Sequence, residues 1–126
     1  MSSQPERYDM VVLGSGEAGK YLAWDAAASG RKTALIERRY IGGSCPNIAC
    51  LPSKNIIHSA SVAHLARQAR DFGLQAPPPG VDMEVIRGRK RRMVEDLMKI
   101  HVERFERTGV ELIRGEGRFV DRKSLK

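Results

Sequence analysis

Short apolar runs alternate with glycine-rich turns over the first third of the chain. The run 8–13 ends at a glycine and is typical of a buried parallel strand. Residues 20–29 are rich in alanine and leucine and precede Gly30, which predicts a helix with a glycine stop. The apolar run 33–37 predicts a second strand. Strand, glycine turn, helix and strand form a βαβ unit over 8–37, so the predicted fold class is α/β, Rossmann-like, with a parallel sheet.

The middle of the chain has a helical pattern that contains two prolines. Residues 46–72 predict a helix, with Pro46 in its first turn. Pro52 should kink or interrupt this helix near Cys50, because proline lacks the N–H that a helix interior needs. The proline-rich stretch 76–80 predicts a surface loop.

The last third predicts one long helix and two short strands. From 82 to 108, apolar residues recur at near-heptad spacing, with Asp82 as N-cap and Gly109 as the stop. Residues 110–114 predict a third strand, and 117–120 begin a fourth, at the start of a β-meander. The apolar positions of the long helix are Ile86, Met93, Leu97, Ile100 and Phe105.

Composition fits an ordinary globular domain. The chain has 126 residues, of which 41% are hydrophobic. No run approaches the roughly 20 apolar residues of a membrane span, and the first apolar stretch is too short for a signal peptide. Disordered, fibrous and integral membrane classes are therefore excluded, and we expect a cytoplasmic protein without membrane partners.

The net charge of +7 arises mostly from one basic run on the long helix. That run has no interleaved aromatic residues and lies on an amphipathic pattern, so it predicts a solvated helix face and no nucleic-acid partner. Its members are Arg87, Arg89, Lys90, Arg91 and Arg92.

The turn after the first strand reads Gly14-Ser15-Gly16-Glu17-Ala18-Gly19. Its first glycine permits a tight turn, the second lets the backbone approach a pyrophosphate, and the third lets the helix pack on the strand. The helix N-terminus then offers free N–H groups to phosphates. Glu37 ends the second strand, where a carboxylate accepts hydrogen bonds from a ribose diol. Arg38 and Arg39 could suggest a 2′-phosphate, but Glu37 occupies the ribose position. The segment predicts dinucleotide binding.

The two cysteines lie five positions apart, at Cys45 and Cys50. In a regular helix their Cα atoms would be about 8.6 Å apart, beyond the roughly 7 Å limit of a disulfide. They can bridge only if Cys45 lies outside the helix or at its frayed start. So small a loop would stabilise the fold by only about 2 kcal/mol, which favours a redox switch over a staple. A helix N-terminus also lowers a thiol pKa, and Lys54, one turn on, could place a positive charge beside a thiolate or a reduced cofactor.

Two other readings of the cysteines are open. With His58 and His64 they could form a zinc set, although the gap from Cys50 to His58 is shorter than usual. They could also be a buried, inert pair. The three histidines are expected to be surface or capping groups, and no metal site is predicted.

Residues 42–54, Gly-Gly-Ser-Cys-Pro-Asn-Ile-Ala-Cys-Leu-Pro-Ser-Lys, closely resemble the active-site signature of the class I pyridine nucleotide–disulfide oxidoreductases. This family includes dihydrolipoamide dehydrogenase, glutathione reductase and mercuric reductase. The resemblance extends from the glycine turn to residues 115–121 and implies that the dinucleotide is FAD. It implies that Cys50 lies next to the flavin, Cys45 exchanges with substrate, and Lys54 lies beside the isoalloxazine. The implied FAD ligands also include Gly14, Ser15, Gly16, Glu17, Ala18, Gly19, Glu37, Arg38, Gly43, Ser44 and Gly117.

Two departures from the family pattern lie inside the redox loop. Ala49 replaces the usual glycine before the second cysteine, and Pro46 replaces a small or apolar residue. Family members are far longer, so residues 1–126 are expected to be the N-terminal part of an FAD-binding domain. The NAD(P)H domain and the interface domain of a homodimer would lie beyond residue 126.

Two functions follow as hypotheses. In the first, electrons pass from NAD(P)H through FAD and the cysteine pair to a small-molecule or protein disulfide, or to a mercuric ion. In the second, the chain is a non-enzymatic dinucleotide-binding module whose cysteines sense redox state.

Overall fold

A three-stranded parallel sheet in the order β1-β2-β3 forms the centre of the fold. The computed structural model describes residues 4–75 and 77–126, so residue 76 of the predicted loop lies outside the described residues. The strands are β1 (Met10–Leu13), β2 (Thr33–Glu37) and β3 (Glu111–Arg114). Val12 pairs with Leu35, and Leu35 pairs with Leu112. The predicted α/β fold with a parallel sheet is confirmed.

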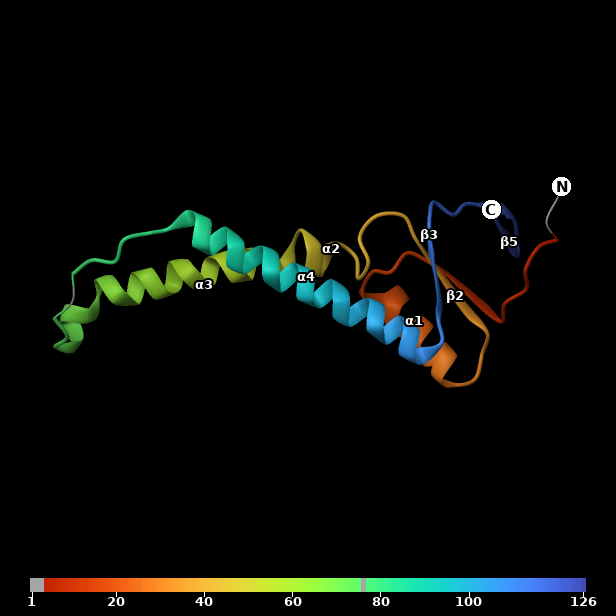
Figure 1. Cartoon of the computed structure of the whole chain (residues 1–126), viewed down its shortest axis with the longest axis horizontal. Helices are drawn as coiled ribbons and strands as arrows, with labels where there is room; N and C mark the ends of the chain where they lie inside the picture. Colours follow the sequence, from red (N-terminus) through yellow and green to blue (C-terminus); the bar gives the residue numbers. More distant parts are fainter. Residues whose placement is uncertain (1–3, 76) are drawn as a thin grey trace.

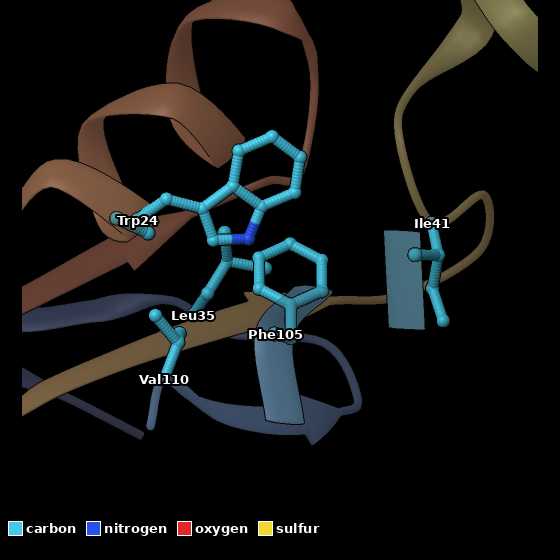
Figure 2. Close-up of a cluster of buried hydrophobic side chains, with 6 residues drawn as sticks. Trp24, Leu35, Ile41, Phe105 and Val110 are labelled. Carbon is cyan, nitrogen blue, oxygen red and sulfur yellow. The ribbon is translucent and has the colours of Figure 1, made fainter. Parts of the chain in front are cut away.

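Helices α1 (Glu17–Ala28) and α4 (Met83–Thr108) bury their apolar sides against this sheet. Figure 2 shows Trp24 of α1, Phe105 of α4 and Leu35 of β2 gathered in one cluster. The two aromatic ring centroids lie 5.2 Å apart. These three side chains are almost fully buried and form the core together with Ala23, Ile41 and Val110.

The prediction that the first strand is buried is wrong for half of its residues. Val11 is 38% exposed and Leu13 is 47% exposed, whereas Val12 packs against the core. The reason is strand order: β2 lies in the middle, which leaves β1 at an edge of the sheet. An apolar run marks a strand, but burial on both faces needs a second covering layer.

The segment predicted as one helix over 46–72 is divided into three. These are α2 (Ser44–Asn47), α3 (Cys50–Arg67) and the 3-10 turn η1 (Ala69–Phe72). The predicted interruption near Cys50 is confirmed, because α3 begins at this residue. Pro52 then lies in the first turn of α3, where backbone N–H groups have no intrahelical partner and none is lost.

Helix α4 begins and ends as predicted. The Asp82 carboxylate accepts hydrogen bonds from the backbone N–H groups of Glu84 and Val85, and Gly109 closes the helix in a left-handed conformation. Of the predicted apolar positions, Ile100 is 55% exposed and does not reach the core. In Figure 1, α3 and the first half of α4 run side by side as an arm that extends away from the sheet.

The predicted fourth strand is β4 (Phe119–Asp121), which pairs antiparallel with β5 (Ser124–Leu125). This hairpin is a separate two-stranded sheet and agrees with the predicted start of a meander. Within the described residues, no helix is both long and apolar enough to cross a membrane.

Two members of the basic run, Arg89 and Lys90, are half-buried, and Arg89 contacts the neighbouring helix. The Arg89 guanidinium donates to the backbone oxygen of Asn55 at 2.6 Å and to the Ser59 hydroxyl at 2.5 Å. Both acceptors belong to α3, so Arg89 ties α4 to α3. The expectation of a solvated face is wrong for this half-buried residue and holds for Arg87, Arg91 and Arg92, which are exposed.

We expect Arg89→Met to lower the free energy of unfolding by about 1–2 kcal/mol, because it removes two charge-assisted hydrogen bonds and keeps the aliphatic stem. Arg91→Met, in the same helix and exposed, is the matched control and should change it by less than about 0.5 kcal/mol. Urea denaturation measures both. Equal effects of the two variants would contradict this assignment of Arg89.

Candidate functional site

The turn between β1 and α1 has the geometry that its glycines predict. Gly14 has φ of +95°, and its N–H donates to the Ile36 backbone oxygen at 2.8 Å. A Cβ at Gly19 would overlap the Gly14 carbonyl oxygen, so this glycine is needed for α1 to approach β1. A Cβ at Gly16 would meet nothing within 4 Å. The open side of Gly16, at the N-terminus of α1, is therefore where a phosphate can approach the backbone.

The Glu37 carboxylate lies at the carboxyl end of β2, beside this turn. One oxygen accepts from the Ser15 N–H at 2.9 Å and from the Ser15 hydroxyl at 2.6 Å. The other oxygen accepts from the backbone N–H groups of Arg39 and Tyr40. Burial alone would raise the pKa of Glu37, but these hydrogen bonds outweigh burial and hold the pKa below its ordinary value. The group is thus a preorganised anion at the strand end.

Ser15 lies behind the site and is fully buried. Besides its bond to Glu37, its hydroxyl oxygen accepts from the Gly42 N–H at 2.9 Å and lies 3.1 Å from the Tyr40 backbone oxygen. One side chain therefore joins the glycine turn, the end of β2 and the loop that leads to the cysteines.

A cavity of about 210 Å³ lies next to Glu37, at the carboxyl ends of all three strands. Arg38 and Glu116 line this cavity. Nη1 of Arg38 lies 3.4 Å from Oε1 of Glu116, and both side chains are more than 70% exposed. A surface ion pair of this kind contributes little stability, so both groups are free to face a ligand. The lining residues are Leu13, Gly14, Ile36, Glu37, Arg38, Gly115, Glu116 and Gly117.

The loop that carries the cysteines packs directly on the glycine turn. Gly43 has φ of +82°, and a Cβ on it would lie 2.6 Å from the Gly16 Cα. Backbone therefore meets backbone, and only glycine fits. The sequence predicts Gly43 as a cofactor residue but does not reveal this contact. The contact brings the cysteine loop beside the N-terminus of α1.

Asn47 closes this loop, a role that sequence reasoning missed. Its side-chain amide donates to the backbone oxygens of Ile41 at 2.9 Å and Gly43 at 2.7 Å. These bonds hold the loop against the single turn of α2. The helical conformation is then interrupted between α2 and α3. The signal in the sequence is an asparagine among glycine, serine and proline, a composition typical of turns.

The break between α2 and α3 separates the two cysteines. Cys45 is half-buried in α2, whereas exposed Cys50 is the first residue of α3, and both are free thiols. Cys45 therefore lies outside the helix that contains Cys50, as expected from the sequence for a pair able to form a disulfide. Ser44, the first residue of α2, and Lys54, one turn beyond Cys50, are also exposed.

The expected lowering of a thiol pKa by the helix N-terminus is wrong for Cys45. Hydrogen bonding to Cys50 is the main cause that raises the pKa of Cys45, with smaller contributions from burial and from the Cys50 charge. Glu17 raises it slightly and Lys20 lowers it. Helix α2 is a single turn, too short for a strong dipole.

The expectation that every histidine is a surface or capping group is wrong for His101. Its ring is half-buried and stacks on Trp24, with centroids 6.0 Å apart. His58 and His64 are exposed along α3, away from the cysteines. Over residues 4–75 and 77–126 no three histidine, cysteine or acidic side chains gather at metal-binding distance, which argues against the zinc reading.

Comparison with known proteins finds a matching family and similar enzymes. Residues 8–126 match the family described as pyridine nucleotide-disulphide oxidoreductase. The chain is 33% identical to mercuric reductase of Lysinibacillus sphaericus over 92% of this chain and 21% of the relative. It is 35% identical to dihydrolipoyl dehydrogenase of Mycobacterium leprae over 94% of this chain and 25% of the relative.

Among solved structures, one similar protein is the HOCl-induced flavoprotein disulfide reductase RclA of Escherichia coli, in a Cu(II) complex. The TM-score is 0.78 at 28% identity, over 96% of this chain and 24% of that chain. The chain thus spans about a quarter of this protein and about a fifth to a quarter of the curated relatives it matches. The family match covers nearly all of the described residues. This chain belongs to the pyridine nucleotide-disulphide oxidoreductase family.

Proposed function

We propose that this chain is the FAD-binding part of a flavin-dependent disulfide or metal-ion reductase. One observation carries the proposal: the contact of Gly43 with Gly16 places the cysteine loop beside the open N-terminus of α1. A phosphate-binding helix end and a thiol pair are thereby neighbours, as a dinucleotide that exchanges electrons with a disulfide requires.

The residues present fit such a dinucleotide. The open side of Gly16 and the N–H groups of Glu17 and Ala18 face the expected pyrophosphate. Glu37 would accept hydrogen bonds from the ribose hydroxyls. Arg38 and the backbone at Gly117 line the cavity expected to receive the adenosine end. By the family resemblance, Gly43, Ser44 and Lys54 would hold the isoalloxazine end. Gly14 and Gly19 shape the turn.

The bound flavin would supply two-electron transfer. Reduction of a Cys45–Cys50 disulfide takes two electrons and two protons and yields two thiols. The Cys45 thiol then loses its proton and attacks one sulfur of an acceptor disulfide, the acceptor S–S bond breaks, and the leaving thiolate takes up a proton. Cys50 displaces the second acceptor thiol and restores the Cys45–Cys50 disulfide. A mercuric ion is the second acceptor class that we propose, since the relatives include mercuric reductases.

The remaining proposals concern the whole enzyme. NAD(P)H is the proposed electron donor, and the proposed enzyme is a cytoplasmic homodimer whose further domains follow residue 126. Lys54 places a positive charge one helical turn from Cys50, where it would stabilise a thiolate or a reduced cofactor.

A second candidate function is a non-enzymatic dinucleotide-binding module with redox-sensing thiols. The exposure of Cys50 favours it as an alternative, because an exposed thiol reacts readily with oxidants. Mass spectrometry of the nucleotide that stays bound to the purified protein through gel filtration separates the two. The proposed function predicts FAD and a flavin absorption band. A nucleotide without a flavin, or a colourless protein after incubation with FAD, would contradict the proposed function.

We expect the 126-residue chain alone to be inactive even with FAD bound. Turnover needs a hydride donor on the other flavin face and an acid–base group for the thiol leaving group. The sequence has no second glycine-rich nucleotide site, and His58 and His64 point into solvent along α3. Nicotinamide absorbance, followed with FAD, NADH or NADPH and a small disulfide, measures this. Turnover above a free-flavin control would refute the expectation.

A further inference from the structure

A buried lysine lies on the side of α1 that faces α4. The Lys20 side chain is 3% exposed, and its ammonium lies 2.7 Å from a Glu17 carboxylate oxygen. On its other side the ammonium lies 3.3 Å from Nε2 of His101, on α4. A buried ammonium is costly unless charged and polar partners surround it. This arrangement supplies one carboxylate and one imidazole.

The contact with Lys20 fixes the state of the His101 ring. An ammonium can only donate, so Nε2 accepts and the proton of a neutral ring lies on Nδ1. Burial lowers the pKa of His101 most, the Lys20 and Arg104 charges lower it further, and Glu17 opposes them. The lowered pKa favours the neutral ring of His101, in which Nε2 accepts from Lys20.

The loop that leads to Cys45 contacts this imidazole at Gly42. Gly42 has φ of +90°, and a Cβ on it would lie 2.6 Å from His101 Nδ1. The next residue, Gly43, meets Gly16 in the same way. The loop is thus held between α1 and α4. Cys45 lies two residues beyond Gly43, and Glu17 follows Gly16, so both residues lie beside this backbone contact. The neighbouring groups that shift the pKa of the Cys45 thiol are Cys50, Glu17 and Lys20.

We propose that Lys20 and His101 are positioning residues for Cys45: His101 supports the loop at Gly42 and holds the Lys20 ammonium beside Glu17, so that this ion pair stays where α1 meets the loop of the exchanging thiol. This inference rests on the proposed function for its place in the reaction. To attack an acceptor, the Cys45 thiol must release its proton to solvent. Lys20 favours the thiolate, and Glu17 disfavours it.

The test follows the alkylation of Cys45 by iodoacetamide against pH. The parent is the chain with Cys50→Ala, in which Cys45 is the one remaining cysteine. Lys20→Met should move the midpoint to higher pH, since a positive charge that favours the thiolate is lost. Glu17→Gln should move it to lower pH. Midpoint shifts of opposite sign for Lys20→Met and Glu17→Gln indicate an effect of charge. A general loosening of the fold would instead shift both midpoints in the same direction.

His101 is tested with two substitutions in the same parent. His101→Leu removes the acceptor and should shift the midpoint upward, as Lys20→Met does. His101→Gln keeps an amide oxygen that can accept from Lys20 and should stay near the parent. The matched controls are Lys99→Met and His64→Gln, which remove exposed groups away from the loop. They should leave the midpoint unchanged.

Circular dichroism checks that each variant is folded. If Lys20→Met unfolds, Glu17→Gln decides, because the Glu17 side chain is 53% exposed. Unchanged midpoints relative to the controls, or shifts of the same sign for Lys20→Met and Glu17→Gln, would overturn the inference. The assay needs no flavin, so a failure of FAD binding would remove the proposed function without altering these shifts.

Discussion

Replacing Gly19 with alanine is expected to lower the free energy of unfolding by about 3 kcal/mol, at the upper end of overpacking effects. The added methyl group would overlap the Gly14 carbonyl oxygen and come 3.2 Å from the Val12 side chain. The overlapped atom is backbone, and the hydrogen bond from Gly14 to Ile36 holds that backbone in place. Relief therefore requires α1 to move off the sheet.

Urea denaturation measures this loss, and Gly80→Ala is the matched control. Gly80 lies in the loop before α4, and a Cβ on it would meet nothing within 4 Å. Its substitution should change stability by no more than about 0.5 kcal/mol. A Gly19→Ala variant as stable as the control would mean that α1 does not approach the turn as closely as described.

The two cysteines are expected to give different spectra when mutated in the whole flavoenzyme. Cys45→Ser should leave the Cys50 thiolate against oxidised flavin, with a long-wavelength charge-transfer band. Cys50→Ser should give no such band. The expectation rests on the family resemblance, which implies that Cys50 lies next to the flavin. In the structure Cys50 begins α3 with Lys54 one turn on, whereas Cys45 lies in α2 across the helix break.

Visible absorption spectra of both variants with FAD bound measure this difference. Cys45→Ala is a useful control, because it also removes the exchanging thiol and should keep the band. Equal spectra from Cys45→Ser and Cys50→Ser would contradict the assignment of Cys50 as the thiol beside the flavin.

The positions of strands and helices along the chain can be predicted from local sequence patterns. How deeply each strand is buried cannot be predicted in this way. The run 8–13 predicts β1, and the run 33–37 predicts β2, because apolar residues and glycine stops are local signals. Which strand lies in the middle depends on where β3 pairs, about 75 residues beyond β2. The half-exposed state of Val11 and Leu13 could not be predicted for that reason.

The same distinction separates the predicted part of the site from the missed part. Gly14, Gly16 and Gly19 act within one turn, so their spacing is informative. The contact of Lys20 with His101 joins positions 81 residues apart, and nothing in either local sequence indicates the other. A lysine within an alanine-rich helix and a histidine within an amphipathic one are ordinary exposed residues until packing places them together.

If the turn at Gly16 holds the pyrophosphate of FAD, a substitution at this glycine should weaken FAD binding, which a fluorescence titration with FAD measures. The wild-type chain and Gly16→Ala are compared. A Cβ at Gly16 meets nothing within 4 Å, so the variant should fold with unchanged stability. The methyl group would occupy the space through which the backbone approaches the phosphates, so we expect FAD affinity to fall about tenfold or more. A folded Gly16→Ala chain that binds FAD as tightly as the wild type would contradict the account.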